Sequence, residues 1–532
     1  MKIRTSRLAI IPTQLKNWSP YLIAILIIFL MKLPTINNSI IFIDEPAYLA
    51  QARRLDSLEA FIYAFQYRTE TKFQLGLIPY ILAQVINQSY AILIMRLFGL
   101  IALVISACLI ISLSKRLFKT VVPSFFCLIL WSTYFYRGPG TAVPLMEYFQ
   151  LPFLLLALWL FLHAIQNPFK LNSNLFWSGI SLGLAALIKL ATLSLVPVAV
   201  LALLLHLYWH NSRRWQILFK SKSVYLLCLG VIVPILLFVL PYFLKPETLP
   251  ELRFNLFQVT VDYASYEKQS LLNHLLQLLS IFEFVDYIVI LTAFSSFFIS
   301  KFIIHRDKWQ LVDTYQLFLV FIGSFIFIGY AAGQSKVHYL IPILPFLLLF
   351  AGYQFNIYWQ KLKNRKNRKN RMVNIKVIYI IAFLLFIILF KLNNFILYYQ
   401  LYTDNGKLYR DGMAGVDLEL LVSYVKTNSK PQDYIWVYYN APELYWLSDR
   451  KVATNEPTGT WLTDYYNETW FDRTYQQLEH DRPALIIGIN KPHYPRSNVA
   501  TLTELPKIKN LLKQNYNCDI ISIKDIVLCK LY

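Results

Sequence analysis

Residues 223–244 read SVYLLCLGVIVPILLFVLPYFL, a stretch without a charged side chain. An apolar helix of about twenty residues spans the hydrocarbon core of a bilayer. Two further stretches, 95–112 and 375–392, are almost entirely apolar over a similar length. The strands of transmembrane β-barrels instead alternate between apolar and polar residues in short segments. Continuous runs of this length therefore predict α-helices that cross a membrane.

The composition of the whole chain agrees with that prediction. Of 532 residues, 57% are hydrophobic and only 15% are charged, a balance typical of polytopic helical membrane proteins. We predict an all-α polytopic membrane protein of about eleven transmembrane helices, followed by a C-terminal α/β domain. The predicted membrane helices are residues 18–36, 92–114, 121–137, 145–165, 175–190, 192–209, 223–244, 280–303, 311–331, 338–358 and 375–397.

The distribution of basic residues sets the predicted orientation. Lys and Arg in short loops collect on the cytoplasmic side of a membrane, and a cytoplasmic N-terminus puts the basic loops of this chain there. The loop at 361–376 carries eight Lys and Arg residues and no acid. Such loops beside anionic headgroups explain the net charge of +21 without nucleic acid. The sequence predicts a multi-pass protein of the inner (plasma) membrane that contacts membrane lipids and no nucleic acid.

An odd number of crossings places residues 398–532 on the outer, extracytoplasmic side. Acidic and basic residues are mixed in this segment, and short apolar runs alternate with helical patterns, which predicts a small α/β domain with its own core. The predicted strands include 434–439 and 484–488, and the predicted helices are 415–428, 472–480 and 505–514.

The chain is thus predicted to divide into a membrane domain and an outer domain. The membrane domain, 1–397, includes two long outer loops at 37–91 and 245–279, and the outer domain is 398–532. The stretches 47–61 and 75–86 in the first outer loop are amphipathic and suit the membrane interface.

Cysteines are few, and two of the five lie in the predicted outer domain. The spacing of Cys518 and Cys529 suits adjacent strands, and an oxidising compartment permits a bridge between them. Two unpaired buried thiols are the alternative. The sequence contains no CxxC, no His/Cys metal pattern, no P-loop and no GxGxxG. It therefore gives no support to an ATP-driven pump or a soluble nucleotide-sugar enzyme.

The outer loops hold the candidate site. Asp44 and Glu45 follow the first apolar segment almost at once, and an acid at the mouth of a span is placed to act as a base on a hydroxyl. The alternative for Asp44 is a cap on a helix that starts at Pro46. Cations on the outer side run against the positive-inside bias, and near an acidic pair they indicate a phosphate-binding pocket. These cations, each with snorkelling to the headgroups as its alternative, are Lys72, Arg137 and Lys336.

Further motifs follow the same order along the chain. Residues 183–189 read GLAALIK, residues 336–345 read KVHYLIPILP, and residues 433–437 and 442–445 read DYIWV and PELY. Together with the acidic pair and Lys72, this order resembles the membrane-embedded C-type glycosyltransferases. The resemblance is to the group that contains the protein O-mannosyltransferases and the bacterial aminoarabinose transferases.

This resemblance implies a fold, a reaction and a set of residues. The reaction would be the inverting transfer of a hexosyl or pentosyl unit from a dolichyl- or undecaprenyl-phosphate donor to a hydroxyl of a lipid, glycan or protein. Residues 1–397 would form the glycosyltransferase domain, with Asp44 as the base and Glu45 or Lys72 orienting it. A departing phosphate needs cationic stabilisation. The residues implied in donor-phosphate or substrate binding are Glu70, Lys72, Arg137, Lys189, Lys336, His338 and Tyr339.

Two departures from the family pattern leave the acceptor and a divalent metal open. Residues 71–74 lack the prolines of the family turn, and Glu70 lies one position too early to precede Lys72 directly. Arg137 is followed by Gly-Pro-Gly and only later by Glu147. We assign no metal ligands and no cofactor.

Two other classes of protein are alternative interpretations of this sequence. A lipid or polysaccharide flippase or transporter calls for charges midway through spans and for internal repeats; the charges are scarce, and we find no repeat. A non-catalytic assembly protein would use the outer domain to bind a partner. Lys189 bears on this choice, because a charge within a span is a functional hypothesis by default, yet near the outer end of its span it also permits snorkelling.

Overall fold

The structure is a computed structural model, and its chain divides into two compact units. The first unit comprises Met1–Ile36, Leu97–Leu236 and Gln269–Tyr399, and the second comprises Asn37–Arg96, Leu237–Lys268 and Gln400–Tyr532. The residues that the structure describes are 10–36, 44–67, 74–136, 143–210, 222–259, 341–365, 418–438, 441–455, 468–489, 502, 505–521 and 526–532.

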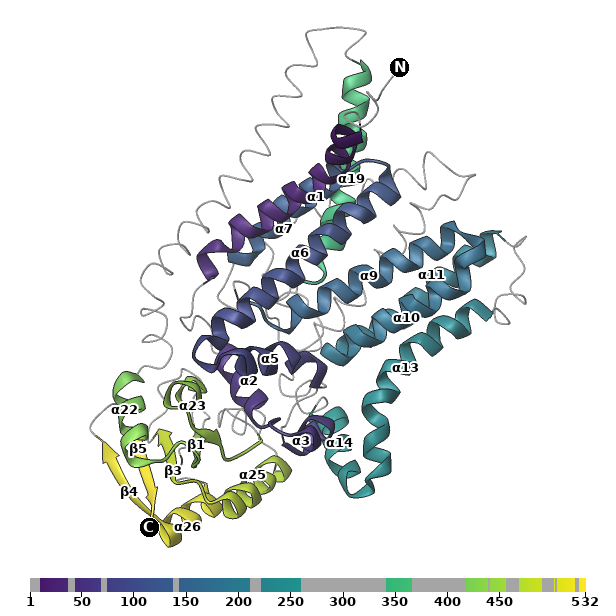
Figure 1. Cartoon of the computed structure of the whole chain (residues 1–532). Helices are drawn as coiled ribbons and strands as arrows, with labels where there is room; N and C mark the ends of the chain where they lie inside the picture. The colour runs from purple at the N-terminus through teal and green to yellow at the C-terminus, as the bar shows by residue number, and fades with distance from the viewer. Residues whose placement is uncertain are drawn as a thin grey trace, which may run out of the picture. The chain divides into compact units, whose positions relative to one another are not determined.

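The described part of the first unit is helical (Figure 1). Two of its helices, α6 and α13, have their outermost turns within the sequence limits of the second unit. Short 3-10 segments, such as η4 (Tyr134–Tyr136) and η6 (Leu190–Ser194), follow several helices. The helices are α1 (Ile10–Lys32), α6 (Ala91–Phe118), α7 (Val122–Thr133), α9 (Met146–Gln166), α10 (Leu171–Ile188), α11 (Leu195–His210), α13 (Lys222–Leu244) and α19 (Leu344–Arg365).

Five helical stretches in the described ranges are long and apolar enough to cross a membrane. They are Asn17–Thr35, Gln88–Phe118, Met146–Gln166, Leu171–Ile188 and Lys222–Leu244, which match five of the predicted membrane helices.

Three more predicted membrane helices correspond to shorter apolar helices. These are Val122–Thr133, Leu190–Leu204 and Leu344–Tyr353. In α7 the helix gives way to η4 after Thr133, which leaves it shorter than the apolar run in the sequence. The predicted helices at 280–303, 311–331 and 375–397 lie outside the described residues, so the total of eleven stays a prediction.

Helices of the first unit approach one another closely. Helices α9 and α10 lie side by side (Figure 1). Helix α10 also packs on α13 through two glycines, because a Cβ at Gly179 would lie 2.2 Å from the carbonyl oxygen of Leu227 and one at Gly230 would lie 2.2 Å from that of Phe176. Any larger side chain at either position would force these helices apart, as small residues at membrane helix contacts allow close packing.

The second unit contains the sheet. Its strand order is β2-β1-β3-β5-β4, with β1 parallel to β2 and β3, and with β5 antiparallel to β3 and β4. The strands are β1 (Tyr434–Tyr438), β2 (Lys451–Val452), β3 (Leu485–Ile489), β4 (Tyr516–Ile521) and β5 (Ile526–Leu531). The helices of this C-terminal part are α22 (Leu418–Asn428), α23 (Glu443–Ser448), α25 (Glu468–Asp481) and α26 (Pro506–Asn515). The predicted strands and helices of this segment are thereby confirmed to within a few residues.

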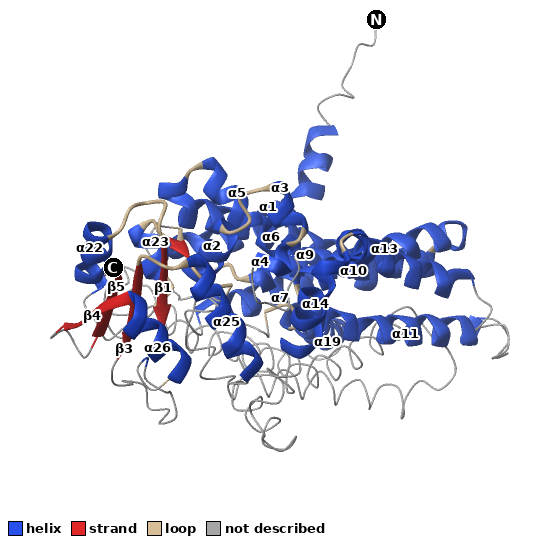
Figure 2. Ribbon diagram, turned by 90° about the horizontal axis from the view of Figure 1, so that it is seen from below, coloured by secondary structure: helices blue, strands red, loops and turns tan. Residues whose placement is uncertain are grey.

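Helices cover both faces of this sheet (Figure 2). On one face, Trp436 and Ile486 join the apolar side chains of α25 and α26. On the other, Ile435 and Ile487 join those of α22 and α23. Alternate residues of β1 and β3 are therefore buried on opposite faces. This explains why these strands are apolar at every position and not only at every second one.

Helices from residues 44–90 and from residues 246–258 complete the second unit. Ala50 of α2 packs with the α22 and α23 side chains, and Phe254 packs with those of α25 and α26. These helical elements are α2 (Asp44–Arg53), α3 (Leu58–Ile62), α4 (Ala64–Tyr67), η2 (Gln74–Leu77), α5 (Ile78–Ile86), η3 (Gln88–Tyr90), η7 (Pro246–Thr248), α14 (Leu249–Arg253) and η8 (Phe254–Gln258).

Cys518 and Cys529 form a disulfide, as one of the two alternatives predicted. They face each other across the antiparallel pair β4 and β5, eleven positions apart in the sequence. Because the closed loop is short, we expect the Cys518→Ser, Cys529→Ser double variant to lower the stability of the sheet by about 2–3 kcal/mol. Calorimetry of the full-length protein measures this loss. Mass spectrometry of unreduced peptides that finds both thiols free would contradict the bridge itself.

Glu443, the first residue of α23, is a buried acid. Its Oε2 atom has no hydrogen-bond partner in the described part of the chain, and burial raises the pKa of its carboxyl to about 7. The pKa of an unfolded Glu is lower, so the folded state pays an increasing penalty as the pH rises from about 4.5 to about 7 and the full penalty above that.

We therefore expect Glu443→Gln to stabilise the sheet at pH 8 by up to about 3 kcal/mol and to change little at pH 4. The amide keeps the size of the side chain and cannot ionise. Calorimetric melting of the full-length variant and wild type at both pH values measures the difference. Equal shifts at the two pH values would mean that Glu443 does not titrate in this range.

Candidate active site

The acidic pair opens a short helix of the second unit. Helix α2 begins at Asp44, so both acids lie in its first turn, where negative charge suits the helix dipole, and Pro46 follows as the third residue. Glu45 is fully buried, whereas Asp44 is partly exposed. Successive residues of a helix point about 100° apart, so the two carboxylates leave α2 in different directions.

Glu45 is held by an arginine that the sequence analysis did not include. Arg96 of α6 donates from Nε to Glu45 Oε1 at 2.9 Å and from Nη2 to Oε2 at 2.8 Å. Both side chains are buried, with 1% of Arg96 and none of Glu45 exposed. A two-pronged guanidinium–carboxylate contact of this kind fixes orientation as well as distance. The contact ties the first turn of α2 to α6.

A signal for Arg96 was present in the sequence. It is a cation inside an otherwise apolar run, and ionisable residues in such runs are functional or paired. Its partner was not predictable, because nothing local to Arg96 indicates a contact with residue 45.

Lys189 belongs to the first unit, at the end of α10. It forms an ion pair with Glu147 in the first turn of α9, and both side chains are largely buried. The ammonium group of Lys189 therefore pairs with a carboxylate inside the protein, and its functional role stays a prediction.

Polar side chains near Lys189 and Glu147 in the sequence extend this cluster of the first unit. Gln150 of α9 donates to Thr192 of η6, and the Oε1 atom of Gln150 has no donor among the described residues. Lys32, at the end of α1, donates to the hydroxyl of Tyr148 at 2.9 Å and lies 4.7 Å from the ring centre of Phe135. A lysine packed on two aromatic rings gains a cation–π contribution.

Lys32, Tyr148 and Gln150 were not among the predicted site residues. The position of Lys32 at the end of an apolar helix is common for lysines that snorkel, so the sequence offered no reason to separate it from them. Only the spacing along α9 places Glu147 and Gln150 on one side of that helix.

The remaining predicted site residues fall outside the described ranges. They are Glu70, Lys72, Arg137, Lys336, His338 and Tyr339. Their roles stay predictions. Within the described ranges, no three His, Cys, Asp or Glu side chains come together as the ligands of a metal ion would.

No protein-family model and no curated protein matches the sequence. Among solved structures, ArnT from Cupriavidus metallidurans bound to undecaprenyl phosphate aligns with a TM-score of 0.57 and 11% identity, over 97% of this chain and 98% of that one. The chain has the ArnT fold.

Further solved structures also align with this chain. The apo state of ArnT aligns with a TM-score of 0.53 and 13% identity, over 95% of this chain and 96% of that one. The archaeal oligosaccharyltransferase AglB from Archaeoglobus fulgidus, in complex with an inhibitory peptide and a dolichol-phosphate, aligns with a TM-score of 0.52 and 12% identity, over 89% of this chain and 69% of that one. The resemblance to membrane-embedded C-type glycosyltransferases is thus confirmed for the fold, and the chain is a multi-pass membrane protein.

Proposed function

We propose that this protein is a glycosyltransferase that moves a sugar from a polyprenyl-phosphate donor to a hydroxyl of an acceptor at the outer face of the membrane. The observation that carries the proposal is the ArnT fold over 97% of the chain, with an acid pair at the start of α2. ArnT was solved with undecaprenyl phosphate and AglB with a dolichol-phosphate, so two proteins of this fold bind the leaving group that the reaction requires.

The proposed reaction is a single inverting displacement. The acceptor oxygen forms a bond to the anomeric carbon of the sugar while the bond from that carbon to the phosphate oxygen breaks. Asp44 takes the proton of the acceptor hydroxyl. Glu45 does not compete for this role in our proposal, because Arg96 engages both of its oxygens.

Polyprenyl phosphate leaves with additional negative charge, which cations stabilise. Lys72, Arg137 and Lys336 are the proposed cations, and Glu70, His338 and Tyr339 are proposed neighbours that orient them or the phosphate. Lys189 has a different proposed task, because its pairing with Glu147 neutralises much of its charge. The pair would hold hydroxyl groups of a substrate, and the Oε1 atom of Gln150, which accepts no hydrogen bond from the described residues, offers an additional acceptor.

Two observations favour this proposal over a flippase or a passive assembly protein. An acid at the start of α2 that is partly exposed beside a fully engaged one suits proton transfer rather than transport. Lys189 and Glu147 form a buried ion pair, and Gln150 and Thr192 form a buried hydrogen bond, whereas a surface that binds a partner protein is exposed. The sugar and the acceptor are left to experiment.

The experiment that tests the proposal uses purified protein in detergent. A polyprenyl-phosphate sugar is supplied with lipid, glycan and peptide acceptors in turn, and released polyprenyl phosphate is measured. We expect release to depend on one class of acceptor. Movement of intact donor between leaflets of sealed vesicles, without release, would support the flippase instead.

The proposed orientation has its own test. Positive charge at 361–376 predicts that this loop is cytoplasmic and that residues 398–532 are extracytoplasmic. Single cysteines placed in each segment of the full-length protein should react differently with an impermeant label on intact cells, with only the C-terminal segment labelled. Labelling of the basic loop alone would reverse the topology and remove Asp44 from the outer face.

A further inference from the structure

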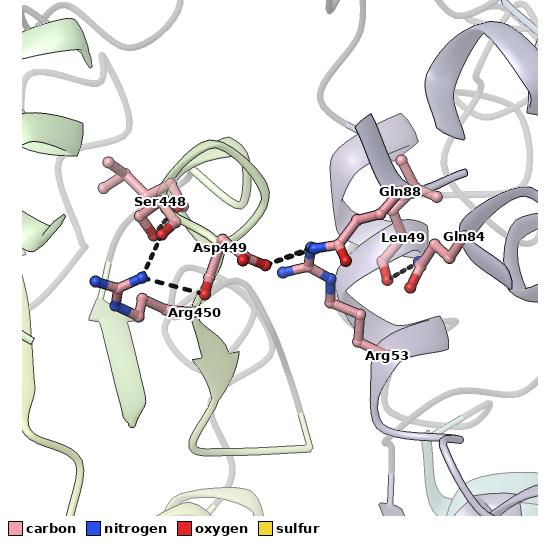
Figure 3. Close-up of polar contacts among 8 residues, drawn as sticks. Leu49, Arg53, Gln84, Gln88, Ser448, Asp449 and Arg450 are labelled. Atoms are coloured by element: carbon pink, nitrogen blue, oxygen red, sulfur yellow. Dashed lines mark hydrogen bonds and ion pairs between the residues drawn. The ribbon is translucent and has the colours of Figure 1, made fainter. Parts of the chain in front are cut away.

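The C-terminal end of α2 is fastened to the sheet of the second unit. Arg53, the last residue of α2, forms an ion pair with Asp449 at 2.8 Å. Gln88 of η3 donates to the same carboxylate oxygen at 2.6 Å (Figure 3). The guanidinium group of Arg53 also lies 4.9 Å from the ring centre of Trp446 in α23. We call the C-terminal part of the second unit, residues 418–532, the sheet domain. Asp449 of this domain thus receives donors from two elements, α2 and η3.

The next residue, Arg54, also forms hydrogen bonds to the sheet. Arg54 donates from Nη1 to the carbonyl oxygen of Val452 at 2.9 Å and to that of Thr454 at 2.5 Å. Val452 belongs to β2 and pairs with Ile435 of β1. Arg53 and Arg54 therefore hold two successive stretches of the same sheet edge, and we call these two residues with their partners the α2 clamp.

Asp449 is presented to the clamp by a rigid turn. It ends α23 in the left-handed conformation, at a φ of 60°, which Asp and Asn tolerate better than most residues. The neighbouring Arg450 donates to the carbonyl oxygen of Ser448 at 2.6 Å (Figure 3). It also donates to the carbonyl oxygen of Ser429 at 2.6 Å. Hydrogen bonds within the sheet domain hold this turn, so Asp449 moves together with that domain.

Apolar and backbone contacts leave α2 little freedom. Ala50 packs into the cluster formed by α22, α23 and the sheet, and the carbonyl oxygen of Leu49 accepts a hydrogen bond from Gln84 of α5 at 2.6 Å (Figure 3). A helix of ten residues is marginal in isolation, and its stability comes from packing. The position of α2 therefore depends on the Arg96–Glu45 contact at its first turn and on the elements that hold its other end.

We propose that the sheet domain acts as a positioning element for the acidic pair through the α2 clamp. Asp44 and Glu45 lie about 14 Å along the same helix from Arg53, with no break between them. A displacement of the clamped end moves Asp44 as well. The inference rests on the proposed function, in which Asp44 is the base, and it assigns to Arg53, Arg54 and Asp449 a role in rate rather than in substrate binding.

The experiment compares clamp variants with a matched control in the full-length protein. The strong variant is Arg53→Ala with Arg54→Ala. The mild variant is Asp449→Asn, which keeps the left-handed turn and an acceptor for Gln88 but removes the charge that faces Arg53. The control is Asp472→Asn, which breaks the ion pair with Lys507 on the same domain without touching α2.

Two readouts are needed, namely steady-state kinetics and hydrogen exchange of the amides of residues 44–53. A misplacement of about 1 Å can cost about a hundredfold in rate, so we expect kcat to fall about tenfold to a hundredfold in the double variant, with the donor KM little changed. Exchange in α2 should rise at least about tenfold, and Asp449→Asn should give smaller changes in the same direction. Asp472→Asn should match wild type in both.

Several results would overturn the proposal. These are an unchanged kcat despite faster exchange in α2, a lower kcat with unchanged exchange, or a rise in donor KM alone. If the double variant does not fold, Asp449→Asn decides the same questions. If wild-type protein transfers no sugar, the proposed function fails, and the exchange measurement still shows on its own whether the sheet domain holds α2.

Discussion

Asp44→Asn is expected to lower the rate of sugar transfer by about a hundredfold to ten-thousandfold while the protein still folds and inserts into the membrane. The reason is that an amide has nearly the shape of the carboxylate and can still serve a helix end, but it cannot take the proton of the acceptor hydroxyl. The measurement is kcat with saturating donor and acceptor, together with a folding check by calorimetry. A role confined to the start of α2 predicts little loss.

The matched control for this variant lies in α3 of the same unit. Glu59 is exposed and pairs with Lys245 at 2.8 Å, so Glu59→Gln makes the same chemical change on a residue with no proposed part in the reaction. It should behave like wild type. Near-normal turnover by Asp44→Asn would make this acid structural, and the search for the base would move to Glu45, Glu70 and Asp262.

Arg96→Ala destabilises the second unit by about 3–5 kcal/mol, the usual cost of leaving one member of a buried ion pair without its partner. The carboxylate of Glu45 loses the two hydrogen bonds from Arg96, and solvent cannot replace them because Glu45 is fully buried. Chemical unfolding of the full-length protein in detergent gives the change in stability. Because Glu45 lies in the first turn of α2, activity should also fall in the fraction that remains folded.

A second variant separates charge from packing. Glu45→Met with Arg96→Met removes both charges and keeps apolar bulk, so it should regain much of the lost stability. An exposed pair provides the comparison, because Lys507→Ala breaks the contact with Asp472 at a cost below about 1 kcal/mol. A loss of that small size for Arg96→Ala would mean that the Glu45 contact contributes no more than a surface ion pair.

The parts of the fold that depend on local pattern were predictable from the sequence. Long apolar runs identify membrane helices such as α9 and α13, and β1 and β3 follow from short apolar runs between polar segments. The bridge between Cys518 and Cys529 was one of two alternatives that the spacing of these cysteines left open, and the structure shows that both lie on the paired strands β4 and β5. The end of α7 was not, since the apolar run continues where the helix gives way to η4.

The contacts of the candidate residues within each unit are long-range, and this explains why they were not predicted. Arg96 lies 51 positions from Glu45, and Lys32 lies 116 positions from Tyr148. No periodicity or motif spans such separations. The helix start at the acid pair was predictable because an apolar segment precedes the pair and Pro46 follows it, and α2 does begin at Asp44. The catalytic role of the pair stays a prediction.

The central claim is that this protein breaks the bond between a sugar and polyprenyl phosphate, with Asp44 taking the acceptor proton. The most direct test reconstitutes wild type and Asp44→Asn in vesicles that carry a polyprenyl-phosphate sugar and the acceptor found by screening, and it follows both products together. We expect wild type to form glycosylated acceptor and free polyprenyl phosphate in equal amounts, and Asp44→Asn to form about a hundredfold less of both. Equal rates for the two proteins, or donor consumed without glycosylated acceptor, would contradict it.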